Sequence, residues 1–144
     1  MPTPPYVFLP HTTDAYIEAV GTSFEEALQN AAAALIDTMC NLPLVDTIST
    51  DEIQVEGENE FALLYDWLEA ILLKFELEQK VYSQFLVKLT TLPSDHLRIK
   101  AVVKGERYDR RKHGSKVEVK AVTFHRMEIS RTPSLTTLRF ILDL

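Results

Sequence analysis

The segment from about Glu60 to Glu78 carries apolar side chains over so wide a face that it must be buried against a large neighbour. The stripe follows the spacing of a helix and consists of Phe61, Leu64, Leu68, Leu72 and Phe75, widened by Leu63, Trp67 and Ile71. A helix with so broad an apolar face normally packs on a β-sheet. We therefore interpret Trp67 as a core anchor and not as a ligand platform.

A second helix is predicted to begin with Ser23 as its cap and to be terminated by Asn41 and Pro43. Ser23 and Glu26 have the spacing of a capping box, in which each side chain bonds the backbone N–H of the other residue. The apolar stripe of this helix consists of Phe24, Leu28, Ala31, Leu35 and Met39. Its alanine-rich middle, residues 30–35, favours a helix and lets another element approach closely.

The remaining apolar residues lie in short segments that are typical of strands. These segments are 6–10, 15–20, 53–55, 85–89, 97–103, 116–130 and 136–144. The order strand, helix, strand, helix and then several strands predicts an α+β fold with an antiparallel or mixed sheet and the two main helices packed on one face. The chain has 144 residues, no internal repeat and no long linker. It is therefore predicted to form a single domain over residues 1–144.

Composition excludes several classes of protein. No apolar run is long enough to span a membrane, and the N-terminus lacks the pattern of a signal peptide. Cys40 is the only cysteine, so neither an intramolecular disulfide nor a cysteine-rich zinc site is expected. A cytoplasmic protein without membrane contact follows. The net charge of −6 disfavours strong direct nucleic-acid binding, because phosphate contacts need a basic surface.

Acidic residues stand near both ends of the chain. The segment His11-Thr12-Thr13-Asp14 precedes a strand, where a carboxylate can project from the end of a sheet, although such residues also form simple turns. Asp143 follows an apolar strand that should hold the terminus in the sheet, beside the terminal carboxylate of Leu144. Adjacent anionic oxygens repel unless a cation compensates them, and such ligands suit Ca²⁺, Mg²⁺ or Mn²⁺. A solvated acidic tail is the alternative.

Two further segments combine polar residues that could bind or react. Strict alternation over 116–130 puts Thr123 and His125 on an apolar face, where a satisfied core hydrogen bond, a site, or a bulge that turns them outward would each explain them. Gly105 is expected to open a polar loop that ends near Gly114. Asp109 and His113 in this loop could be metal ligands or an acid–base pair, although a solvated loop explains them as well.

Together these segments resemble the archease family over essentially the whole chain. The matching residues are Phe8–Asp14, Gly21–Ala27, Leu63–Leu73, Gly105–Asp109 with His113, Glu118–His125 and Ile141–Leu144. The resemblance implies a small accessory protein that binds a divalent cation, with Ca²⁺ favoured over Mg²⁺ or Mn²⁺. It also implies a partner, the GTP-dependent tRNA-splicing ligase, whose guanylylation and repeated turnover archeases promote and whose nucleotide use they can broaden.

The resemblance also implies a set of site residues. The metal ligands carried over from the family are Asp14, Asp143 and an oxygen of Leu144. No residue is assigned a catalytic role. Further residues with a possible functional role are His11, Asp109, His113, Lys120, Thr123 and His125. On this view the ion is presented to the ligase active site, where it neutralises triphosphate charge.

Two alternatives belong to other functional classes. A metal-dependent phosphoesterase or nucleotidyl transferase would need Asp14, Asp143, Asp109 and His113 to converge in one pocket, and the chain contains no phosphate-binding glycine loop. A general chaperone-like scaffold would need neither the metal nor the acidic residues. The position of Asp14 relative to Asp143 and the end of the chain separates these readings most directly.

Overall fold

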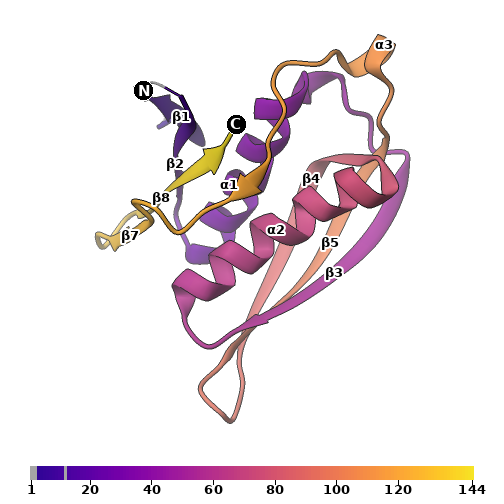
Figure 1. The fold of residues 1–144 in the computed structure, drawn as a ribbon. Coiled ribbons are helices and arrows are strands. Elements are labelled where there is room, and N and C mark those ends of the chain that lie inside the picture. Colours follow the sequence, from indigo (N-terminus) through magenta and orange to yellow (C-terminus); the bar gives the residue numbers. More distant parts are fainter. Residues whose placement is uncertain (1–2, 12) are drawn as a thin grey trace.

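The computed structural model describes residues 3–11 and 13–144. The elements in chain order are β1 Tyr6–Leu9, β2 Ala15–Gly21, α1 Phe24–Met39, the 3-10 helix η1 Leu42–Leu44, β3 Ser49–Gly57, α2 Glu60–Glu78, β4 Lys80–Thr91, β5 Leu97–Arg107, α3 Arg110–His113, β6 Ala121–Val122, β7 Glu128–Arg131 and β8 Thr136–Asp143 (Figure 1). Within this described part, every helix is too short or too polar to cross a membrane.

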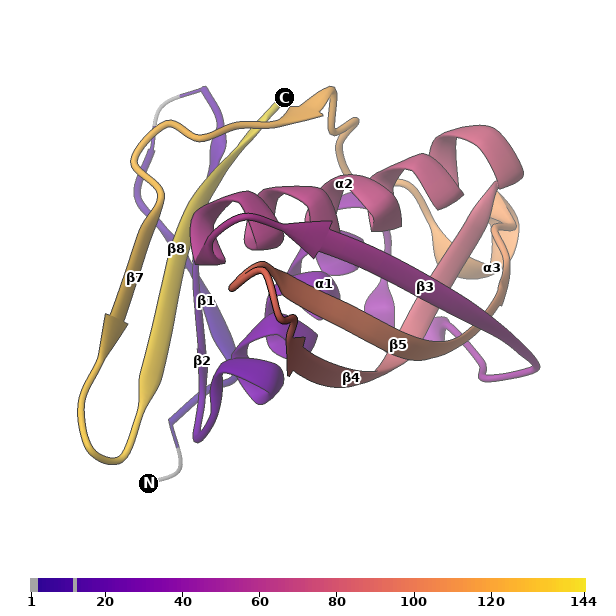
Figure 2. The ribbon, with the colours of Figure 1, turned by 90° about the horizontal axis from the view of Figure 1, so that it is seen from below.

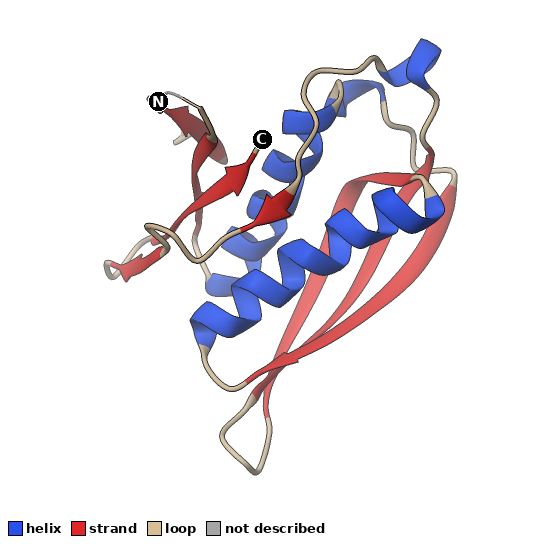
Figure 3. Cartoon of the chain, in the orientation of Figure 1, coloured by secondary structure: helices blue, strands red, loops and turns tan. Residues whose placement is uncertain are grey.

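The strands form two antiparallel sheets. One has the order β1-β2-β8, with β6 and β7 both pairing on the far side of β8, and the other has the order β3-β5-β4. The helices α1 and α2 lie between the two sheets, so each sheet carries helices on one face only (Figure 3). The predicted α+β class is confirmed. The strands are divided between two sheets rather than joined in one, because α1 is buried on nearly all sides and needs a sheet on each side.

Local sequence explains why α1 begins and packs where it does. The Ser23 hydroxyl accepts a hydrogen bond from the Glu26 N–H at 3.1 Å, and the Glu26 carboxylate accepts one from the Thr22 N–H at 2.9 Å. The first bond is that of the predicted capping box, whereas the return bond goes to the N–H of Thr22 and not to that of Ser23. Small side chains let β2 and β4 approach the helix from two sides, and the fully buried ones are Ala27, Ala31, Ala32 and Ala34.

The wide apolar face of α2 is buried as predicted. Trp67 is fully buried, and its indole N–H donates to the Leu28 carbonyl of α1 at 2.8 Å, which confirms its role as a core anchor. Asn59 caps the helix by accepting from the Ala62 N–H. Phe61 is an exception, because it lies in the first turn and is 44% exposed.

Gly105 does not open a loop, as the sequence suggested. It is a buried residue of β5, which continues to Arg107. A Cβ at this position would lie 1.9 Å from the Val81 carbonyl oxygen of β4, where the register of the two strands shifts between Tyr82 and Gln84. The glycine therefore permits a close approach of two strands.

The predicted strand over residues 116–130 is wrong over residues 116–120 and again over residues 123–127. Of this segment, only β6 and β7 pair with β8, and the five residues 123–127 lie opposite two residues of β8. Thr123 remains half-buried and donates its hydroxyl to the Ile141 carbonyl at 3.0 Å, whereas His125 is exposed. Arg126 takes a positive φ of 54°. A bulge therefore removes His125 from the apolar register.

Candidate functional site

The pairing of β2 with β8 brings the two acidic ends of the chain together. Ala15 pairs with Leu142 in this antiparallel register, and the same register continued by one residue sets Asp14 opposite Asp143. Asp14 directly precedes β2 and Asp143 is the last residue of β8, so both belong to the same end of this antiparallel strand pair. The end of β8 lies next to the C-terminus (Figure 1). We call Asp14, Asp143 and Leu144 the chain-end cluster.

Buried neighbours hold the chain-end cluster in place. Ile141 and Leu142 are 2% and 0% exposed, so β8 is anchored almost to its last residue. The backbone N–H of Lys120 donates to the Asp143 carbonyl at 2.7 Å, and Ala121 then pairs with Asp143 in β6. Three separate segments of the chain therefore meet at this end of the sheet.

His11 lies beside the chain-end cluster. Its Nδ1 is 3.9 Å from the Asp14 carboxylate, and its ring meets Tyr16 edge-to-face at 6.1 Å between centroids. The Nδ1 atom is buried and finds no hydrogen-bond partner in the described residues. Thr12, which belongs to the same sequence segment, lies outside the described residues.

The donor atoms of the chain-end cluster agree in kind with a hard divalent cation. Ca²⁺ binds six to eight oxygens and accepts carboxylates, main-chain carbonyls and water. In the described part of the chain, no group of three or more His, Cys, Asp and Glu side chains is placed to hold a metal ion. A cation here would therefore need the oxygens of Leu144 together with the carboxylates of Asp14 and Asp143.

Two contacts that the sequence did not single out involve the bulge between β6 and β7. Phe124, in the bulge between β6 and β7, is 56% exposed and stacks on Tyr65 of α2 with centroids 4.4 Å apart. Arg126 lies over the ring of Tyr16 at 5.9 Å. The sequence offered one signal for Phe124, namely an aromatic side chain at a position that the alternating pattern of residues 116–130 assigns to the polar face.

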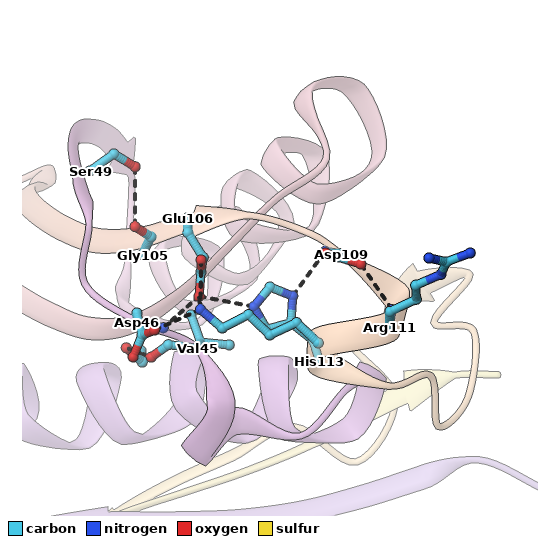
Figure 4. A network of polar contacts seen from close by, with 10 residues as sticks. Val45, Asp46, Ser49, Gly105, Glu106, Asp109, Arg111 and His113 are labelled. Carbon is cyan, nitrogen blue, oxygen red and sulfur yellow. Dashed lines mark hydrogen bonds and ion pairs between the residues drawn. The ribbon is translucent and has the colours of Figure 1, made fainter.

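The segment 105–114 is held by a network centred on Glu106 (Figure 4). One oxygen of this carboxylate accepts hydrogen bonds from the Asp46 N–H and Lys112 at 2.7 Å each, and lies 3.0 Å from Nε2 of His113. Burial acts to raise the pKa of the Glu106 carboxyl, but the bonds from Lys112, His113 and the Asp46 backbone outweigh it and lower the pKa to about 2. Glu106 is thus a firmly ionised structural acceptor.

His113 is fully buried and serves the same network. Its Nδ1 accepts from the Asp109 N–H at 2.9 Å, so Nε2 carries the proton and donates to Glu106. Tyr108 stacks on the imidazole and donates its hydroxyl to the Gly114 carbonyl at 2.6 Å. Both ring nitrogens are therefore engaged, which leaves none free for a metal or for proton transfer.

The other polar residues of the segment also have structural contacts. The Asp109 carboxylate caps α3 by accepting from the Arg111 N–H at 2.9 Å, and Lys112 bridges Glu106 and Asp46. The part played by Asp46 was missed, because it lies 60 positions before Glu106 in a polar linker. Figures 1 and 2 show α3 well apart from the C-terminus, so Asp109 and His113 do not join Asp14 and Asp143 in one pocket.

Comparisons with known proteins agree with this arrangement. The model of the Archease protein family (MTH1598/TM1083) matches residues 6–144. The chain is 39% identical over 123 residues to protein archease of Pyrococcus abyssi, covering 85% of this chain and 86% of that protein. It is 34% identical over 140 residues to protein archease of Methanopyrus kandleri, covering 97% and 99%.

Solved structures show the same fold. The solution structure of Methanobacterium thermoautotrophicum protein 1598 superposes with a TM-score of 0.83 at 34% identity, covering 97% of this chain and 99% of that one. A crystal structure from Thermotoga maritima, described as an archease and possible chaperone, gives a TM-score of 0.61 at 19% identity, covering 100% and 98%. Because the family model and these relatives span nearly the whole chain, this protein belongs to the archease family.

Proposed function

We propose that this protein is a non-catalytic accessory factor of the GTP-dependent tRNA-splicing ligase in the cytoplasm. It promotes guanylylation and multiple turnover of the ligase and broadens its nucleotide use, through a divalent cation held by the chain-end cluster. Membership of the archease family supports an accessory role. The observation that carries the proposal is the β2–β8 register, which brings Asp14 opposite Asp143 from the two ends of the chain.

The residues of this chain have distinct parts in the proposal. The carboxylates of Asp14 and Asp143 and an oxygen of Leu144 hold the cation, with Ca²⁺ favoured and Mg²⁺ or Mn²⁺ also suited to oxygen ligands. When bound, the ion supplies positive charge that offsets the triphosphate of the ligase substrate. His11 lies beside Asp14, and the Lys120 N–H fixes the main chain of Asp143.

The charge of the protein suits a protein partner better than RNA. The chain carries a net charge of −6, and a ligase that binds RNA and GTP needs a positive cleft. Complementary charge speeds association and fixes orientation. The acidic accessory protein therefore meets the ligase directly, without strong contact to nucleic acid.

The test is ligase guanylylation, measured as label transferred from GTP, with and without this protein. The paired Asp14→Ala and Asp143→Ala variant should lose the stimulation, because the cation loses both carboxylates. A matched control replaces the exposed Glu58 and Glu76 with alanine, which removes the same number of negative charges away from the chain-end cluster residues. Undiminished stimulation by the Asp14 and Asp143 variant would overturn the metal site.

A chaperone-like scaffold is the second candidate, because a solved relative of the same fold is described as a possible chaperone. This function would not depend on the cation. The same guanylylation assay separates the two, since a scaffold would retain its effect in the paired aspartate variant and in the presence of a chelator.

A further inference from the structure

Within the residues that the structure describes, no helix or further strand covers the outer face of the β3-β5-β4 sheet. The helix α2 lies across the inner face, whose residues Ile53, Ala101 and Val87 pair across the three strands and are buried (Figure 2). Residues one position along each strand point the other way. The outer face therefore presents a row of Glu52, Val102 and Leu86 and a row of Gln54, Lys100 and Lys88.

Three lysines on this face, Lys88, Lys100 and Lys104, outnumber the one unpaired carboxylate that β3 contributes within the described chain, Glu52. Lys88 lies directly opposite Lys100, and Lys104 follows two rows away on the central strand. None of these three lysines forms an ion pair with the described acidic residues, whereas Arg98 on the same strand pairs with Glu56 at 3.5 Å. Like charges directly opposite each other destabilise a sheet. The free protein therefore keeps a cation pair that lowers its own stability.

Apolar surface adjoins the lysines. Leu86 is 64% exposed and Val102 is half-buried beside it. The two rows surround an open depression of about 620 Å³ that is lined by Glu52, Gln54, Leu86, Lys88, Lys100 and Val102. This sheet face thus combines an exposed leucine with unpaired lysines around it. Protein interfaces commonly have such an apolar centre with charged residues at the rim.

We propose that this outer lysine face, formed by Leu86, Lys88, Lys100, Val102 and Lys104, docks an acidic segment of another protein. An apolar side chain of that segment lies on Leu86 and Val102, and flanking carboxylates pair with the lysines. Single-stranded RNA fits less well, because the face has no aromatic ring on which a base can stack, and the protein as a whole is acidic. The surface belongs to the other sheet from the chain-end cluster, so the inference does not rest on the proposed function.

The test is a titration of isotopically labelled protein, followed by the NMR amide shifts of β4 and β5. The probe is a synthetic peptide with leucine flanked by glutamates, and separate arms use the same peptide with glutamine for glutamate and an oligouridylate. The acidic peptide should shift the amide signals of Leu86, Lys88, Lys100 and Val102. The glutamine peptide should shift the same signals only weakly, and the shifts caused by the acidic peptide should become smaller at high salt.

Variants make the test decisive. Lys88→Gln with Lys100→Gln should weaken peptide binding by about tenfold, while the midpoint of urea unfolding stays the same or rises because the like-charge pair is gone. The control Arg110→Gln with Arg111→Gln changes the net charge equally on exposed residues of α3 and should leave binding unchanged. Equal loss in both variants, shifts outside β4 and β5, no saturable binding of the acidic peptide, or tighter binding of oligouridylate at this face would each overturn the proposal.

Discussion

Replacing Glu106 with glutamine should destabilise the protein in a pH-dependent way. The carboxylate accepts hydrogen bonds from the Asp46 N–H, Lys112 and His113 and is only 12% exposed, so solvent screens these contacts weakly. Lowering its pKa from 4.5 to about 2 corresponds to about 3 kcal/mol, at about 1.4 kcal/mol for each pH unit. The glutamine amide also replaces one acceptor oxygen by an NH₂ group, which cannot accept hydrogen bonds from these three donors, so some of the bonds are lost. We expect a loss of about 3 kcal/mol at pH 7.

The sign of the pH dependence follows from the direction of the pKa shift. The folded state holds the Glu106 proton less tightly than the unfolded state, so the ionised carboxylate stabilises the fold above pH 4.5. This contribution is lost as the pH falls from 4.5 towards 2. The difference between the wild type and Glu106→Gln should therefore be constant between pH 7 and pH 5.5 and shrink below pH 4.5.

The assay is urea unfolding at several pH values, with the free energy of unfolding extrapolated to water. The control is Glu52→Gln, an exposed residue on β3 that forms no ion pair within the described chain, and it should stay within about 0.5 kcal/mol of the wild type. A Glu106→Gln difference that does not change between pH 7 and pH 3, or that matches the control, would refute the network as a source of stability.

Three further perturbations test other parts of the molecule. Millimolar CaCl₂ should raise the melting temperature of the wild type but not that of the Asp14→Ala, Asp143→Ala variant, because a cation that binds only the folded state stabilises that state. The melting temperatures are measured by differential scanning fluorimetry, and equal responses of the two proteins would contradict the site. Trp67→Phe should cost about 2 kcal/mol in urea unfolding, since the Leu28 carbonyl loses its buried donor, and a neutral result would contradict the anchor role. Ser23→Ala should cost about 1 kcal/mol by loss of the α1 cap, with Ser23→Thr as the conservative control that retains most of it.

The sequence located the two main helices well. The stripe and cap signals predicted α1 and α2 with ends close to those of the structure, because both depend on contacts within one or two turns of the same segment. The division of the strands into two sheets could not be predicted in this way. It depends on α1 being buried from two sides, a property that involves β2 and β4 together.

For the candidate site too, the sequence indicated which residues could act and the structure decided how they are arranged. The sequence marked Asp14 and Asp143 as acidic residues at strand ends, and the family resemblance joined them, but only the β2–β8 register sets one opposite the other. It also marked Asp109 and His113 as possible ligands, whereas the structure engages both in the network around Glu106. The decisive partner in that network, Asp46, is remote in the sequence.

The sequence by itself determined the helices, the α+β class and the residues able to supply hard oxygen ligands, because these follow from side-chain chemistry and from neighbours along the chain. Tertiary structure alone decided the division of the strands into two sheets, the bulge at residues 123–127 and which polar side chains are engaged in structural hydrogen bonds. The physical reason is that strand register is fixed by contacts between residues that are far apart in the chain, and a shift of one residue changes every face that a strand presents.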